Sequence, residues 1–138
     1  MKSKLLKKFN KVLICFTGLL GFTVSCNNGE AYGTPQAEYI LKGVVKSSKT
    51  EQVIKGIKVS MSGESDITDI QGNYNIRLIV FPELRHQVTL TDIDTLENGF
   101  FLEKDTIVFF PENGYKGGDD WNKGTNEMNC DIYLQPKE

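Results

Sequence analysis

The part of the chain after Glu38 consists of short β-prone segments separated by turn-forming residues. In the second of these segments Ile57, Val59 and Met61 alternate with polar side chains, which is the two-residue period of a strand with one buried face. No segment of useful length shows the 3.6-residue apolar spacing of an amphipathic helix. Seven strands are predicted, over residues 38–47, 53–62, 67–69, 74–80, 86–93, 105–110 and 129–135.

Short strands at this spacing, without helices, predict an all-β fold: an antiparallel β-sandwich of immunoglobulin-like type. The segment 111–128 is expected to be a long loop. Two adjacent pairs, Phe100-Phe101 and Phe109-Phe110, must each turn one ring outward if they lie in strands. The alternation predicts a core of Ile40, Val44, Ile57, Val59, Tyr74, Ile76, Val88, Leu90, Val108, Ile132 and Leu134.

Residues 1–25 differ in composition from the rest of the chain. They contain five lysines and no acid, whereas all 18 acidic residues occur from Glu30 onward. An uncharged apolar run follows over residues 12–24, and as a helix it would span about 20 Å, short of the ~30 Å hydrocarbon core of a bilayer. The pattern is typical of a secretory signal peptide rather than of a permanent membrane span.

The residues Phe-Thr-Val-Ser-Cys at 22–26 resemble the lipobox of bacterial lipoprotein signals. The resemblance implies that a diacylglycerol is attached to the Cys26 sulfur, with palmitate-type acyl chains, and that the chain is cut before this residue. Two acyl chains anchor a protein stably, since each buried methylene contributes about 0.8 kcal/mol. We expect a signal peptide over 1–25, a lipidated N-terminus and tether over 26–37 and a sandwich over 38–138. A plain signal peptide with an incidental cysteine is the alternative.

Cys130 is the only cysteine left once the signal peptide is removed and Cys26 is lipidated, so no intrachain disulfide is expected. It shares a two-residue period with Ile132 and Leu134, which favours a small buried hydrophobe over a nucleophile. His86 is the single histidine of the chain, which weakens any Ser–His or Cys–His mechanism.

From Cys26 onward the chain carries 11 basic and 18 acidic side chains, a net charge near −7. This balance excludes the basic footprint of a nucleic-acid-binding domain. No glycine-rich phosphate loop and no histidine-rich zinc motif occurs. No catalytic set of residues is recognisable, so we expect a protein that is not an enzyme and has no cofactor beyond the diacylglycerol at Cys26.

Two loops offer candidate binding residues. Asp92, Asp94 and Glu97 supply oxygen ligands of the kind calcium prefers, although their spacing departs from the EF-hand template. The alternative is a solvated loop in which the aspartates cap turns. In the glycine-rich segment, Tyr115 and Trp121 could stack on a sugar or a peptide. The alternative there is that the tryptophan folds back over the end of the sandwich.

Three segments carry a family resemblance: Leu-Lys-Gly-Val-Val at 41–45, Ile-Lys-Gly-Ile-Lys-Val at 54–59 and Thr-Asp-Ile-Gln-Gly-Asn-Tyr at 68–74. Together they resemble the carboxypeptidase regulatory-like domain, which is a transthyretin-like β-sandwich. In this pattern Gly72 is expected to turn the chain with a positive φ, and Tyr74 to enter the core.

A second resemblance is carried by residues 31–39, 92–99 and 117–124, in that order after Cys26. It is to the radical-SAM-associated lipoproteins of Bacteroidetes-type bacteria. The resemblance implies a radical-SAM enzyme as a partner in the same pathway, and it implies no activity of this chain.

These observations predict a lipid-anchored cell-envelope protein on the periplasmic or surface face of the outer membrane. Its non-catalytic sandwich would bind or present something to an envelope protein or a glycan, with no nucleic acid involved. One alternative is a substrate or accessory protein of a radical-SAM modification system. Another, less favoured, is an envelope hydrolase that uses acidic residues.

Overall fold

The computed structural model describes residues 33–94 and 97–138. The chain divides into a unit over Met1–Gly33 and a compact unit over Thr34–Glu138. The predicted signal peptide, Cys26 and most of the predicted tether therefore lie outside the described residues. In the described part, no helix has the length and apolar character needed to cross a membrane.

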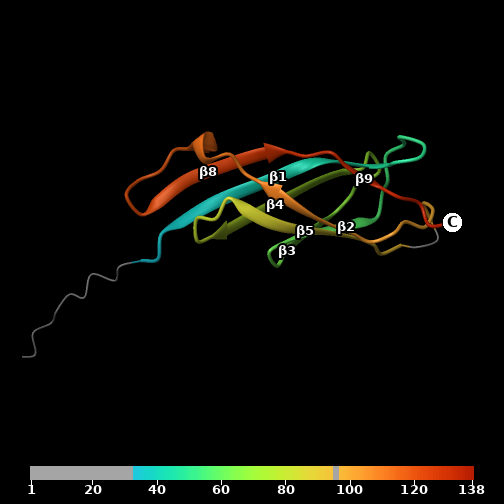
Figure 1. The fold of residues 1–138 in the computed structure, drawn as a ribbon, viewed down its shortest axis with the longest axis horizontal. Helices are drawn as coiled ribbons and strands as arrows, with labels where there is room; N and C mark the ends of the chain where they lie inside the picture. Colours follow the sequence, from blue (N-terminus) through green and yellow to red (C-terminus); the bar gives the residue numbers. More distant parts are fainter. Residues whose placement is uncertain (1–32, 95–96) are drawn as a thin grey trace, which may run out of the picture. The chain divides into compact units, whose positions relative to one another are not determined.

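The described residues form nine strands and one short 3-10 turn, with no α-helix (Figure 1). The all-β prediction is thus confirmed. The elements are β1 (Gln36–Ser47), β2 (Ile57–Met61), β3 (Glu64–Ile67), β4 (Asn73–Val80), β5 (Arg85–Asp92), β6 (Lys104–Phe109), η1 (Glu112–Gly114), β7 (Tyr115–Lys116), β8 (Asn122–Asn129) and β9 (Ile132–Leu134).

Two sheets make up the sandwich. The first has the order β4-β1-β8-β7, with β9 pairing beyond β8 along the second half of β1. The second has the order β3-β2-β5-β6. All pairings within these sheets are antiparallel except those of β1 with β8 and β9, which are parallel. The antiparallel sandwich is therefore present with one parallel seam at β1.

The predicted loop over 111–128 is wrong, because this segment contains β7 and most of β8. The inward-facing positions of β8 are Gly124, Asn126 and Met128, of which the first two are fully buried. Because two of these residues are not apolar, the strand shows no hydrophobic alternation in the sequence. The predicted strand over 129–135 is in turn the end of β8 followed by β9.

The second and third strands begin and end at other residues than predicted. β2 starts only at Ile57, since Gly56 turns the chain with a φ of 78°. β3 covers Glu64–Ile67, so it ends where the predicted strand 67–69 begins. It starts this early because Ser62 and Gly63 have positive φ values, 48° and 98°, and join β2 to β3 in a two-residue hairpin. The polar residues of β3 are typical of a turn in the sequence, but they also suit a strand at the edge of a sheet.

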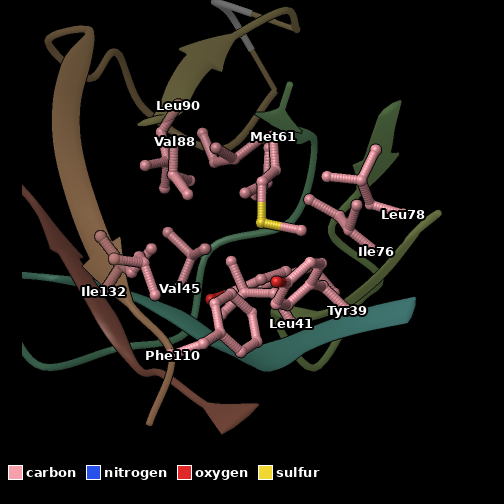
Figure 2. Packing of buried hydrophobic residues seen from close by; sticks show 14 of the residues in the cluster. Tyr39, Leu41, Val45, Met61, Ile76, Leu78, Val88, Leu90, Phe110 and Ile132 are labelled. Atoms are coloured by element: carbon pink, nitrogen blue, oxygen red, sulfur yellow. The ribbon is translucent and has the colours of Figure 1, made fainter. Parts of the chain in front are cut away.

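The core lies between the sheets and is built from side chains of both (Figure 2). Figure 2 shows the Met61 side chain of β2 pointing into the core, on the side where Leu41 of β1 and Ile76 of β4 lie. The predicted core is confirmed except at Ile40 and Val44, which are half-buried, while their neighbours face inward. The buried hydrophobic residues are Ala37, Tyr39, Leu41, Val45, Ile54, Ile57, Val59, Met61, Tyr74, Ile76, Leu78, Val88, Leu90, Val108, Phe110, Ile132 and Leu134.

There is a physical reason why the sequence assigned the wrong face of β1 to the core. β1 is an interior strand, with β4 on one side and β8 and β9 on the other. Its outer face is half-covered, so Ile40 and Val44 are tolerated there beside the Lys42–Glu127 ion pair. Because apolar residues occur on both faces of β1, the sequence alternation does not show which face points inward.

The segment 68–74, which carried part of the family resemblance, acts as a structural turn. The buried Thr68 donates its hydroxyl to the Ile54 carbonyl at 2.7 Å and accepts the Ile57 amide at 2.9 Å. Asp69 accepts the amide of Asn73 at 2.9 Å, and Gly72 has the expected positive φ, 75°. These contacts fix the connection between β3 and β4.

Candidate functional site

The acidic loop after β5 uses its carboxylates as turn acceptors. Asp92 accepts the amide of Asp94 at 3.3 Å with Oδ1 and the amide of Phe101 at 2.9 Å with Oδ2. Asp94 Oδ2 accepts the side-chain amide of Asn98 at 2.6 Å. Glu97 is exposed, and no group of three or more potential metal ligands occurs among residues 33–94 and 97–138. Calcium binding by Asp92, Asp94 and Glu97 stays a prediction.

The two aromatic residues of the predicted binding loop have different surroundings. Tyr115 is half-buried, and its hydroxyl forms a 2.6 Å hydrogen bond with the hydroxyl of Tyr39. Lys123 places its Nζ 5.6 Å from the centre of the Tyr115 ring. Trp121 instead exposes half of its surface. The structure therefore makes Tyr115 part of the packing of the sandwich and presents Trp121 to solvent.

The turn before Trp121 is held by one carboxylate. Asp119 Oδ1 accepts the backbone amides of Trp121 at 3.0 Å and Asn122 at 2.8 Å. These two hydrogen bonds, that of Asn122 first, lower the pKa of Asp119 because they favour its charged form. The Trp121 carbonyl accepts the amide of Gln36, which connects this turn to the first residue of β1.

His86 lies in a buried aromatic cluster that sequence reasoning did not find. Its ring centre is 4.5 Å from that of Tyr39 and 5.5 Å from that of Phe110. Nδ1 lies 3.4 Å from Ser62 Oγ, and Nε2 is buried without a hydrogen-bond partner. Burial lowers the pKa of His86, so the ring is neutral.

Cys130 is a free thiol packed against the core. Burial raises the pKa of this thiol, which keeps it protonated and unreactive at neutral pH. Ile132 and Leu134, which share its predicted face, are buried. Cys130 itself is only half-buried, so the predicted small buried hydrophobe packs against the core without being fully covered.

Two open grooves lie along the seam between β6 and the end of the chain. One, of about 400 Å³, is lined by β6 residues and by Met128, Cys130 and Ile132. The other, of about 380 Å³, includes Leu102 and Tyr133. The prediction that each phenylalanine pair turns one ring outward is confirmed, because Phe100 and Phe109 are exposed while their partners are buried or half-buried. The Cys130 thiol, which lines the first of these grooves, has a raised pKa.

No protein-family model matches the chain, and a search of curated proteins found no match. Solved structures that match the chain include a protein of unknown function from Bacteroides fragilis, described as putatively membrane-associated, at 13% identity and a TM-score of 0.48. That similarity covers 75% of this chain and 30% of the other.

Two further solved structures match over most of this chain. The pilus 2b backbone protein of group B streptococcus matches at 8% identity and a TM-score of 0.47, over 70% of this chain and 40% of the other. The C-terminal domain of the Caf1A usher matches at 14% identity and a TM-score of 0.38, over 72% and 99% of the two chains. This chain spans less than half of the first two proteins. At such TM-scores none of the three assigns a family or a function to it.

Proposed function

We propose that this chain is a lipid-anchored cell-envelope protein whose β-sandwich is a non-catalytic module for binding or presentation. One observation carries the proposal: the lipobox-like residues 22–26, which end at Cys26 directly after a lysine-rich and apolar signal pattern. Cys26 stands only ten residues before Gln36, the first residue of β1. A diacylglycerol on Cys26 would therefore hold the sandwich close to a membrane.

The described residues support the non-catalytic part of the proposal. The single histidine is buried and neutral, and the free thiol is half-buried with a raised pKa. Asp92 and Asp119 accept backbone amides in turns. These residues have structural surroundings, which favours a surface for recognition over a reaction centre.

The partner in this proposal is an envelope protein or a glycan, and the location is the periplasmic or surface face of the outer membrane. Membership of a radical-SAM pathway rests on the sequence resemblance alone. It has a separate test, the intact mass of the mature protein. A chain modified by such an enzyme would carry mass changes on residues 27–138 beyond the acyl chains, whereas a plain binding module would not.

The anchor is tested by replacing Cys26 with alanine. The unmodified protein should stay in the membrane pellet after an alkaline wash, and Cys26→Ala should move to the soluble fraction because it lacks the sulfur that carries the lipid. Cys130→Ala is the matched control, since it also removes one thiol but should stay in the pellet. Retention of Cys26→Ala in the washed pellet would show that the lipid-anchor proposal is wrong.

A further inference from the structure

One end of the sandwich gathers the three aromatic side chains that are most exposed among the described residues. They are Phe109, Phe81 and Trp121, with 66%, 61% and 51% of their surfaces exposed. Ile79 adds an aliphatic side chain that is 58% exposed. We call this end, defined by Ile79, Phe81, Phe109, Trp121 and the start of β1, the tether end.

The pairing of the strands places these residues together although they are far apart in the sequence. The Trp121 carbonyl accepts the amide of Gln36 at 3.0 Å, at the first residue of β1. On the other side of β1, Glu38 pairs with Ile79, directly before the β4–β5 connection that contains Phe81. Phe109 pairs with the first residue of β5, where that connection ends. Figure 1 shows the start of β1 beside the β4–β5 connection, with the C-terminus at the opposite end of the sandwich.

The tether end is also the end from which the chain runs back toward Cys26. Gln36 stands ten positions after Cys26, so the chain between them reaches at most roughly 36 Å, whatever its conformation. A lipid on Cys26 therefore keeps the tether end within this distance of the bilayer.

The chemistry of the tether end fits the boundary between lipid headgroups and acyl chains. Tryptophan is enriched at that boundary, and phenylalanine side chains bury into it. The chain from Cys26 onward has a net charge near −7, which gives no attraction to an anionic surface. A contact of this end with a membrane would therefore depend on apolar and aromatic burial rather than on basic residues.

We propose that the tether end inserts its exposed aromatic side chains into the lipid headgroup boundary, with Trp121, Phe81 and Phe109 as the contacting residues. This inference rests on the proposed lipid anchor and adds an orientation to it. The sandwich stands with β1 rising from the membrane, so the turn at Asp69–Gly72 and the C-terminus point away from the lipid. Those parts of the surface are then the ones that a partner can reach.

Trp121 provides the test, because it is the only tryptophan of the chain. The acylated protein is reconstituted into vesicles of phosphatidylethanolamine and phosphatidylglycerol, with and without brominated acyl chains. Insertion should shift the Trp121 emission to shorter wavelength, make it sensitive to the brominated lipid and protect it from aqueous iodide. The double variant Phe81→Ser, Phe109→Ser should lose most of the bromolipid quenching.

Ile70→Ser is the matched control for the double variant. Ile70 is 75% exposed and lies at the opposite end of the sandwich, so its replacement should leave the quenching unchanged. All variants change exposed side chains, and unchanged circular dichroism spectra would show that the fold is retained. A double variant that quenches like the unmodified protein would contradict the inference.

The failures of the anchor and of the insertion can be told apart. Acylated, vesicle-bound protein whose Trp121 is quenched by iodide and not by bromolipid would overturn the insertion and leave the anchor intact. Protection from iodide without bromolipid quenching would indicate a protein contact at this end and would also overturn the insertion. Absence of acyl chains from the envelope protein in mass spectrometry would overturn both proposals.

Discussion

His86 lies in the core against the rings of Tyr39 and Phe110, with 2% of its surface exposed. Burial disfavours the charged imidazolium, so the pKa of His86 in the folded protein is lowered from its model-peptide value near 6.5. The Glu83 backbone and carboxylate oppose this shift only in part. The packing of His86 against Tyr39 therefore favours the neutral form of the imidazole ring.

The lowered pKa of His86 predicts that acid destabilises the fold. Between the folded and unfolded pKa values the unfolded chain binds one more proton, so the free energy of unfolding falls as pH drops below about 6.5. Urea unfolding at about pH 8 and pH 5 should show this loss, and His86→Gln should show a smaller loss because it cannot titrate. An equal pH dependence in both proteins would count against this role of His86.

Gly43 lies where β1 passes close to the segment between β8 and β9. A Cβ at this position would overlap the carbonyl oxygen of Cys130. That carbonyl is already held, because it accepts the Tyr74 hydroxyl at 2.6 Å, and the Cys130 amide donates to Lys42. The backbone therefore has little room to give way.

Gly43→Ala should lower the free energy of unfolding by about 1–3 kcal/mol, because the added methyl group forces β1 and Cys130 apart. Gly33→Ala is the control, since a Cβ at Gly33 would meet no atom within 4 Å. Urea denaturation of both variants measures the difference. Equal stability of the two variants would mean that the close approach at Gly43 is easily relieved.

At the scale of the elements, β6 is an exposed edge strand of its sheet. The Phe110 amide donates to the Leu84 carbonyl, and antiparallel pairs alternate, so the backbone groups of Ile107 and Phe109 point away from β5. Both side chains are also exposed. An apolar edge with unpaired backbone groups is a site where another strand can add.

Ile107→Lys should therefore slow aggregation of the protein at high concentration, measured by light scattering, because a charge on the edge opposes strand addition. The free energy of unfolding should change by less than about 0.5 kcal/mol, since the side chain is exposed. Gln87→Lys adds the same charge to the paired neighbour of Ile107 on β5, away from the edge. If both variants slow aggregation equally, net charge rather than the edge is responsible.

At the scale of the whole molecule, the core formed within the described residues 33–94 and 97–138 is made by side chains of the compact unit Thr34–Glu138. Its buried side chains come from both sheets, and β1 pairs with strands on both of its sides. The hydrophobic stabilisation of the sandwich should consequently not depend on the residues before β1.

A fragment of residues 34–138 should therefore fold by itself. We expect a β-type circular dichroism spectrum and a single cooperative urea transition, with the same midpoint as the mature Cys26→Ala chain. A fragment starting at Leu41 is the control, because it lacks half of β1 and should fail to fold. A lower midpoint or a broad transition for 34–138 would show that the preceding residues contribute to stability.

The amino-acid sequence by itself determined the features that depend on local spacing. Strands such as β4 and β5 follow from a period of two, and the positive φ at Gly72 follows from a turn-forming segment. The outward rings of Phe100 and Phe109 follow from the alternation of neighbours in extended chain. These properties involve residues only a few positions apart.

Tertiary structure alone decided which strands pair and which side chains gather. β8 pairs parallel to β1, and its inward residues include Gly124 and Asn126. The sequence of β8 therefore shows no hydrophobic alternation from which the strand could be predicted. The phase of β1 was open because apolar residues occupy both faces. Trp121 and Phe109 reach one end of the sandwich only through pairings between distant strands. Hydrophobic periodicity reports whether a residue is covered, whereas the partner that covers it depends on long-range contacts that no local pattern contains.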